Sequence, residues 1–296
     1  MNVASATVRT PREQAAELAA RLPDLVVSAR RLAHSLMHGV HGRRRAGPGE
    51  NFWQFRPFAS GEPAQRIDWR RSARGTHAFV REREWEAAQT LWLWFDRSES
   101  MNFHSDLALV SKRDRAAVLI FALADLAVRG GERVGLLGLS RPIAARDVID
   151  RFAEILSAPG PAPEPLPPAS PVAARSKLVL IGDFLSEPRP IEDRFATLGA
   201  EGAEGHVLMI ADPVEETFPF EGHTDFLDMA GVARLRAPRA ENFRVGYQDR
   251  LAAQRAAVQA AARGRGWDFA LHRTDASAAS ALLNLHARLT EPAGAA

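Results

Sequence analysis

Three oxygen-bearing side chains alternate along one short stretch of the chain. Asp96, Ser98 and Ser100 occupy every second position of DRSES, which directly follows the apolar run TLWLWF. Side chains at alternate positions of an extended backbone face the same side, so these oxygens are expected to converge. A carboxylate and two hydroxyls form a hard ligand set that suits Mg²⁺ (or Ca²⁺ or Mn²⁺) rather than zinc. The pattern predicts a divalent-cation site with one open position for a partner's carboxylate.

Two further aspartates follow apolar runs in the same way. Asp183 ends KLVLIGD, and Asp212 ends GHVLMIAD. In an open parallel sheet, ligands bind beyond the carboxyl ends of the strands, where the strand order reverses. We therefore predict Asp183 as a fourth metal ligand and Asp212 as an additional metal-site or docking residue. In the alternative interpretation, Asp96 caps its loop and the two serines are ordinary turn residues.

Strands and helices alternate from Thr90 onward, and this alternation must position the three aspartates. The expected strands are 90–96, 132–140, 141–145, 177–183, 205–212 and 267–274, and the expected helices are 112–130, 146–156, 190–202, 242–266 and 276–289. This order predicts an α/β fold with a doubly wound, mainly parallel sheet flanked by helices. The apolar run at 90–95 is continuous, as in a strand that is covered on both faces.

The rest of the chain divides by composition. We expect an N-terminal helical segment and basic loop at 1–46, with helix over 11–38 and Asp24 as a candidate cap after Pro23. A β-rich module follows at 47–89, then the α/β domain at 90–290 and a tail at 291–296. This division leaves the aspartates in one domain.

Two segments interrupt the α/β domain. The Pro-rich loop 157–171 holds seven prolines and cannot form a helix or a central strand. Since it connects a helix to a strand, we place it at the edge that holds the amino ends of the strands. It is a semi-rigid surface loop or a docking site for a proline-binding module. The insertion 213–241 follows a strand and leaves from the carboxyl edge.

Composition narrows the classes of protein. The 296 residues are 46% hydrophobic and 25% charged, and include no cysteine, so disulfides and thiolate metal sites are excluded. We find neither a membrane-spanning apolar run nor a signal-peptide pattern and expect a cytoplasmic protein.

Arginine is concentrated in one region of the chain. Twelve arginines and four acidic residues lie between Arg30 and Arg83. Such an excess suits an acidic partner or nucleic acid, whose binding would depend on Arg70 and Arg71. The aromatic residues of this region, Trp53, Phe55, Phe58 and Trp69, alternate as in strands and are expected to form the core of the module. We therefore regard nucleic-acid binding as the less favoured use of the region.

The stretch DRSESM resembles the metal-ion-dependent adhesion site of von Willebrand factor A-type domains. The preceding stretch GPGENFWQFRPFASGEPAQRIDWRRSARGTHAFVREREWE is similar to the signature of the bacterial domain-of-unknown-function 58 family. The resemblance covers about residues 25–290 and implies a von Willebrand A-like fold with a small β-rich addition. It also implies a non-enzymatic partner of MoxR-type AAA+ ATPases that assembles or activates other proteins.

The resemblance assigns roles to particular residues. Asp96, Ser98 and Ser100 match the first metal loop, and Asp183 matches the aspartate of the later loop. A-type domains place a threonine in a middle loop that has none here, so Ser140, Asp147 or water would take that place. The signature residues are structural in our interpretation, with an ion-pair network among the charged ones: Arg66, Asp68, Trp69 and Arg74.

One rival function uses the same aspartates. A Mg²⁺-dependent hydrolase would employ Asp96 and Asp183, but the chain has no G-x-S-x-G elbow. A phosphatase of the haloacid dehalogenase type needs a second aspartate two residues after the first, where this chain has Ser98. These departures disfavour catalysis.

Overall fold

The structure is a computed structural model that describes residues 11–40, 52–58, 67–73, 78–83, 89–159, 162–229 and 233–290. Only the backbone is described at 11–19, 38–40, 52–56 and 80–83. The chain forms two compact units: Met1–Gly39 with Gln89–Ala296, and Val40–Ala88.

The larger unit is built on a five-stranded sheet. Its strands are β3 (Thr90–Phe95), β4 (Arg133–Leu136), β5 (Lys177–Gly182), β6 (Glu204–Ala211) and β9 (Asp268–Arg273), in the order β4-β3-β5-β6-β9. Every pair within this sheet is parallel. The predicted α/β fold with a mainly parallel sheet is confirmed. The chain adds β4 on one side of β3 and then crosses to place β5 on the other side, so the strand order reverses between β3 and β5.

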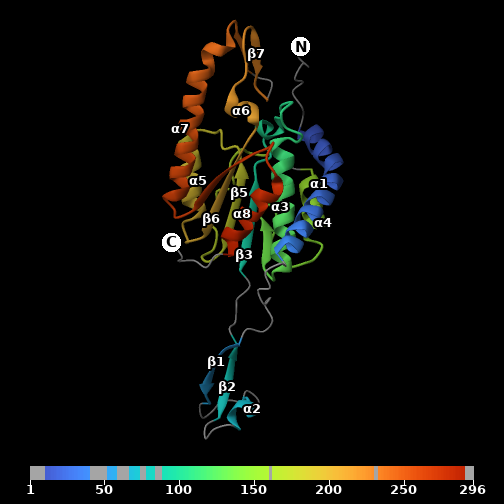
Figure 1. The fold of residues 1–296 in the computed structure, drawn as a ribbon, viewed down its shortest axis with the longest axis vertical. Coiled ribbons are helices and arrows are strands. Elements are labelled where there is room, and N and C mark those ends of the chain that lie inside the picture. The colour runs from blue at the N-terminus through green and yellow to red at the C-terminus, as the bar shows by residue number, and fades with distance from the viewer. Residues whose placement is uncertain are drawn as a thin grey trace. The chain divides into compact units, whose positions relative to one another are not determined.

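Helices cover both faces of this sheet (Figure 1). One core lies against α1 (Pro11–Val40), α3 (Lys112–Arg129), α4 (Val148–Ser157) and α8 (Ala278–Thr290), and the other against α5 (Pro188–Leu198) and α7 (Arg244–Arg263). Along β3, Leu93 and Phe95 enter the first core and Trp94 the second. Burial on both sides explains why β3 and β5 consist of continuous apolar residues.

Helix α1 runs unbroken through Pro23. Asp24 therefore lies inside the helix, and the expectation that it caps a helix is wrong. Leu22, Leu25 and Ala29 are buried in the first core. This packing holds the helical path, although proline removes one backbone hydrogen bond.

The chain reverses direction after β4. Val134 and Ile143 exchange two backbone hydrogen bonds of 2.8 Å in an isolated antiparallel bridge. The strand predicted at 141–145 is reduced to this bridge. The return carries the chain back toward the amino edge of the sheet, so α4 starts there and ends at the carboxyl edge.

The Pro-rich loop therefore begins at the carboxyl edge, and the prediction of the opposite edge is wrong. Pro168 packs against Gly138, which lies just beyond β4 and has a φ of +75°. A Cβ at Gly138 would lie 2.4 Å from Cγ of Pro168. The sequence pattern did not reveal the reversal after β4, because a single bridge leaves almost no periodicity.

The insertion after β6 leaves from the carboxyl edge, as expected. It contains α6 (Pro213–Thr217) and an antiparallel pair, β7 (Thr224–Leu227) and β8 (Arg234–Ala237), before the turn η3 (Ala240–Phe243). Among the helices that the structure describes, none is both long enough and apolar enough to span a membrane.

The smaller unit pairs β1 (Phe52–Pro57) with β2 (Phe79–Arg83) in antiparallel fashion and contains α2 (Trp69–Ser72). Asp68 caps α2 by accepting a 2.9 Å hydrogen bond from the Arg71 backbone N–H. Trp69 is 65% exposed, so its predicted place in a module core is wrong. It lies on a four-residue helix without buried residues. The predicted ion-pair partners Arg66 and Arg74 lie outside the described residues.

Candidate functional site

The reversal of strand order brings Asp96 and Asp183 to neighbouring strand ends. Asp96 follows β3, and its backbone N–H donates a 2.8 Å hydrogen bond to the carbonyl of Ile181 in β5. Both carboxylates are buried, with 0% and 2% exposure. Gly182 permits this approach, because a Cβ there would lie 3.1 Å from Cβ of Asp96.

The loop after Asp96 gathers the predicted oxygens. Oδ1 of Asp96 accepts a 2.7 Å hydrogen bond from the Ser98 backbone N–H. The hydroxyls of Ser98 and Ser100 lie 3.1 Å apart. The turn η2 (Glu99–Asn102) follows and is anchored by Met101, which is fully buried. The structure thus places one carboxylate and two hydroxyls in a single short loop.

Lys112 lies between acidic side chains of this edge. It is the first residue of α3 and is 0% exposed. Its Nζ donates to Oδ2 of Asp183 at 2.9 Å and to Oε1 of Glu215 at 2.6 Å. Burial alone would lower the pKa of Lys112, but Asp183 and Glu215 outweigh burial and raise it. Lys112 is therefore a fixed positive charge inside the site.

Sequence reasoning missed Lys112 and Glu215. The chain contains only two lysines among many arginines, and this rarity was an available signal for Lys112. Glu215 is the third residue of α6, where it accepts a 2.8 Å hydrogen bond from the Asp212 backbone N–H. Burial raises the pKa of Glu215, and Lys112 partly offsets that rise.

Asp212 has a different role from that of Asp96. It is fully buried and caps α6, with Oδ1 accepting from the Val214 backbone N–H at 2.9 Å. Ser105 donates its hydroxyl to Oδ1 at 2.6 Å and its backbone N–H to Oδ2 at 2.9 Å. Both oxygens are therefore engaged, and Asp212 fastens the loop beyond η2 to the start of α6.

The two candidates for the middle-loop position lie elsewhere. The Ser140 hydroxyl accepts a 2.9 Å hydrogen bond from the Leu136 backbone N–H and closes the turn after β4. Asp147 forms a half-exposed ion pair with Arg151 at 3.0 Å, beside the start of α4. The hydrogen bond of Ser140 and the ion pair of Asp147 thus join neither residue to Asp96 or Asp183. In the described part of the chain, no group of three His, Cys, Asp or Glu side chains has metal-binding geometry.

A cation would nevertheless fit beside Asp96. Its Oδ2 is buried and accepts no hydrogen bond from any residue that the structure describes. Burial, and then the neighbouring Asp183, raise the pKa of Asp96 to about 7. Around Lys112 the three carboxylates are Asp96, Asp183 and Glu215. The site therefore offers one unused carboxylate oxygen and, in the adjoining loop, two hydroxyls, which suit a hard cation.

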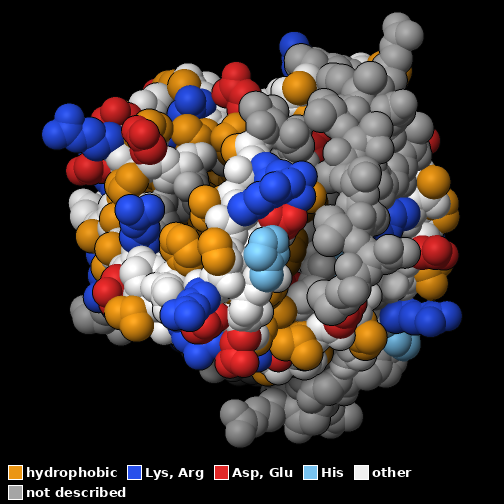
Figure 2. All heavy atoms as spheres, turned by 90° about the horizontal axis from the view of Figure 1, so that it is seen from above, with side chains coloured by type: hydrophobic (Ala, Val, Ile, Leu, Met, Phe, Trp, Pro, Cys, Tyr) orange, Lys and Arg blue, Asp and Glu red, His pale blue; other side chains and the backbone are white. Residues whose placement is uncertain are grey.

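An aromatic pocket of about 650 Å³ adjoins this edge. Its ring-bearing lining residues are Phe103, Phe218, Phe220, Phe226, Phe243 and Tyr247. Glu215 also lines it, and the Phe103 ring centroid lies 5.9 Å from Nζ of Lys112. The pocket and the acidic cluster therefore share residues. Figure 2 views the end of the molecule that holds α6 and β7, where apolar side chains lie in small groups between charged ones.

The fold and this edge define an α/β protein with a doubly wound parallel sheet and buried carboxylates where the strand order reverses. The family described as Protein of unknown function DUF58 matches residues 54–257, and the chain belongs to that family. This match confirms the family resemblance predicted from the sequence.

Two mycobacterial species have proteins that are similar to part of this chain. Uncharacterised proteins of Mycobacterium bovis and Mycobacterium tuberculosis are 33% identical over 121 residues, which span 41% of this chain and 38% of those relatives.

Two solved structures resemble this chain at a distance. An aerotolerance-related membrane protein from Bacteroides fragilis has a TM-score of 0.42 at 18% identity and covers 68% of this chain and 98% of its own. The conserved hypothetical protein BatB from Bacteroides thetaiotaomicron has a TM-score of 0.40 at 16% identity, with 69% and 98% covered.

Proposed function

We propose that this chain is a non-enzymatic protein-interaction protein that binds its partner through a divalent cation, in the manner of a von Willebrand A-like adhesion site. The observation that carries the proposal is the unbonded, buried Oδ2 of Asp96 beside the converging hydroxyls of Ser98 and Ser100. Leaving a buried carboxylate oxygen without a partner is costly, and a cation would remove that cost.

The ion would be held by Asp96, Ser98 and Ser100, with Asp183 adding negative charge next to it. Lys112 already satisfies one oxygen of Asp183 and keeps that carboxylate in place. When bound, Mg²⁺ would offer an open coordination position to a carboxylate of the partner. The Lys112 ammonium would keep the remaining carboxylates from repelling one another.

The surroundings suit binding rather than catalysis. Lys112 is held between two carboxylates and raised in pKa, so it is poorly placed to act as a nucleophile. The adjoining aromatic pocket offers apolar surface on which a partner can bury side chains. On the basis of the family resemblance, the partner we propose is a MoxR-type AAA+ ATPase, with assembly or activation of other proteins as the shared task.

Thermal unfolding with and without metal tests the cation. Wild type, Asp96→Ala and the control Asp147→Ala would be unfolded in EDTA and in excess Mg²⁺, Mn²⁺ or Ca²⁺. A ligand at about a hundred times its Kd stabilises a fold by roughly 2.7 kcal/mol, which raises Tm by roughly 5–11 °C for a domain of this size. Wild type and Asp147→Ala should show the rise and Asp96→Ala should not. An equal rise in all three proteins, or none at millimolar metal, contradicts the site.

A binding assay tests the partner separately. A purified MoxR-type ATPase from the same organism should bind the immobilised wild-type chain in Mg²⁺ but not in EDTA. The Asp96→Ala variant should bind the ATPase no better in Mg²⁺ than in EDTA. Binding that is equally strong in EDTA would support the partner but reject the bridging role of the metal.

A further inference from the structure

The aromatic pocket beside the acidic edge is built around a strained phenylalanine. Phe218 ends α6 with a φ of +44°, in the left-handed region that a residue with a Cβ seldom adopts. Its ring centroid lies 4.9 Å from that of Tyr247, 5.1 Å from that of Phe220 and 5.7 Å from that of Phe226. Arg244 holds this conformation by donating from Nε to the carbonyl of Phe218 at 3.0 Å. The ring cluster is therefore fixed in place in the unbound protein.

One face of α7 supplies a wall of the pocket. Four lining residues follow the i, i+3, i+4, i+7 spacing of a single helix face, starting at the N-cap: Phe243, Gly246, Tyr247 and Arg250. Gly246 is unusual here because glycine is unfavourable inside a helix. A Cβ there would meet nothing within 4 Å, so no close packing contact requires glycine. The missing side chain instead leaves open space in the wall of the pocket.

The charges around the pocket are not balanced. In the described part of the chain, its charged lining residues are Glu215 and Arg250. Glu215 is already paired with Lys112 at 2.6 Å. Arg250 is exposed and has no ion pair with any residue that the structure describes. Burial, and then the charge of Glu215, raise the pKa of Tyr247 to about 12, so its hydroxyl stays neutral. One positive charge at the rim is thus free to pair with an acidic group.

The exposed rim of the pocket suits a protein segment better than a small molecule. Leu235 and Phe243 line the pocket but remain 52% and 44% exposed. A small ligand among the rings would leave these side chains in water, whereas a protein partner would cover them. Glu215 lines the pocket and also belongs to the acidic edge, beside the site proposed for the partner. One partner could therefore contact both.

We propose that the aromatic pocket receives a large apolar side chain of the partner protein, such as Phe, Leu or Met, and that an acidic residue close to it in the partner's sequence pairs with Arg250. A guanidinium group favours a carboxylate because it can donate two parallel hydrogen bonds to it. Apolar anchors that fill a pocket carry much of the binding free energy of a protein interface. This recognition rests on the interaction role proposed above but not on its cation, since neither Arg250 nor the rings are metal ligands.

Selection from a random peptide library displayed on phage tests the proposal. The full chain would be immobilised in EDTA, and peptides that also bind Gly246→Trp would be removed. The tryptophan fills the pocket from an exposed helical position with nothing within 4 Å of the added Cβ, so the variant should fold. Enriched peptides should combine a large apolar residue with a nearby Asp or Glu. In fluorescence anisotropy they should bind wild type at least about tenfold more tightly than Gly246→Trp. No enrichment relative to this variant, or enrichment of basic instead of acidic residues, overturns the proposal.

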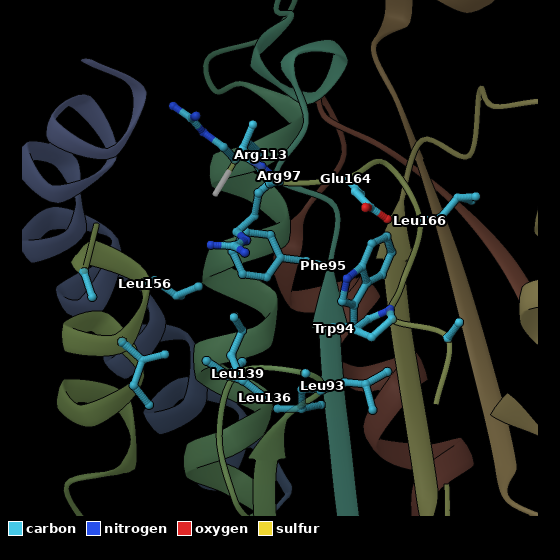
Figure 3. Close-up of a pocket in the computed structure, with 18 of the residues that line it drawn as sticks. Leu93, Trp94, Phe95, Arg97, Arg113, Leu136, Leu139, Leu156, Glu164 and Leu166 are labelled. Atoms are coloured by element: carbon cyan, nitrogen blue, oxygen red, sulfur yellow. The ribbon is translucent and has the colours of Figure 1, made fainter. Parts of the chain in front are cut away.

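Two further variants locate the contacts. Arg250→Gln should weaken binding of a selected peptide about tenfold, but should not weaken binding of the same peptide with its acidic residue changed to the amide. Leu139→Trp is the matched control, since Leu139 is 44% exposed and lines a separate cavity of about 850 Å³ at the ends of β3 and β4 (Figure 3). This control should bind the peptides as wild type does. Equal weakening by the two Trp variants places the peptide elsewhere and contradicts the proposal.

Sedimentation velocity of the chain alone tests for a competing occupant, a second copy of the chain. Wild type should sediment as Gly246→Trp does. A wild-type dimer that Gly246→Trp dissociates would mean that a second copy fills the pocket, which overturns the proposal. Because every measurement is made in EDTA, failure of the metal site leaves these results unchanged. The cation is tested separately by the thermal unfolding described above.

Discussion

Nζ of Lys112 lies 2.9 Å from Oδ2 of Asp183, and both side chains are almost completely removed from solvent. The ammonium also reaches Glu215, so one internal cation joins the end of β5 to the start of α6. Buried ion pairs are retained when hydrogen bonds satisfy the remaining donors and acceptors. The sheet edge is thus organised around a lysine even without a bound metal.

Replacing Lys112 with methionine should strongly destabilise the protein. The change would leave Asp183 and Glu215 buried without their positive partner, and breaking a buried pair costs about 3–5 kcal/mol. Urea unfolding at pH 8 measures the loss. The double variant Lys112→Met, Asp183→Asn is the control. It removes one of the two carboxylates left without a positive partner and should therefore recover part of the stability. A single variant as stable as wild type would contradict the structural role of the pair.

The raised pKa of Asp96 makes stability fall with increasing pH when metal is absent. The unfolded carboxyl ionises near its ordinary value of 3.8, whereas the folded one ionises at about 7. The folded state therefore holds the extra proton between these values, and its advantage is lost as pH rises through 7. At pH 8, Asp96→Asn should be more stable than wild type, by on the order of 4 kcal/mol at most.

The free energies of unfolding of wild type and Asp96→Asn in EDTA, measured from pH 5 to pH 8.5, test whether wild type loses stability as pH rises. The advantage of Asp96→Asn should grow from pH 5, where the unfolded carboxyl is ionised and the folded one is still protonated, and level off above pH 7. Excess Mg²⁺ should reverse the trend for wild type alone, since the metal prefers the ionised carboxylate. A difference that does not change with pH would falsify the assignment.

His272 should make the protein less stable as pH falls, which is the opposite of the effect expected of Asp96. Burial, and then the positive charge of Arg115, lower the pKa of His272 to about 4. Arg115 lies 3.2 Å from Nε2 of the ring. The neutral ring is favoured in the fold, so its contribution is complete above the unfolded value of 6.5 and is lost as pH falls toward 4. Between pH 7 and pH 4.5, wild type should lose stability relative to His272→Gln, as measured by urea unfolding.

Two glycine-to-alanine changes should have opposite effects. At Gly205 in β6, a Cβ would lie 2.1 Å from Cδ2 of the buried Trp267, so alanine should cost about 3 kcal/mol. At the exposed Gly246 in α7, nothing lies within 4 Å of the added atom. Alanine there should stabilise the helix by about 0.5–1 kcal/mol. Thermal unfolding of the two variants checks both signs, and a neutral Gly205→Ala would contradict the packing of Trp267.

Much of the fold could be predicted because β3 and β5 are buried on both faces and leave continuous apolar runs. The same runs located Asp96 and Asp183, since a parallel sheet places consecutive carboxyl ends at one edge. The position of the Pro-rich loop could not be predicted, because it depends on the single bridge between Val134 and Ile143. The pattern that singled out Asp212 is shared by metal ligands and helix caps. Only its contacts with Ser105 and Val214 distinguish the two roles.

The buried ammonium of Lys112 also constrains how the chain can fold. Lys112 is separated from Asp183 by 71 positions and from Glu215 by 103. During synthesis, α3 emerges long before either partner, and the closure of such loops is entropically unfavourable and slow. Lys112 must therefore stay hydrated until β5 and α6 are in place. We expect the acidic edge to close in a late step of folding, after the apolar faces of β3 and α3 have joined.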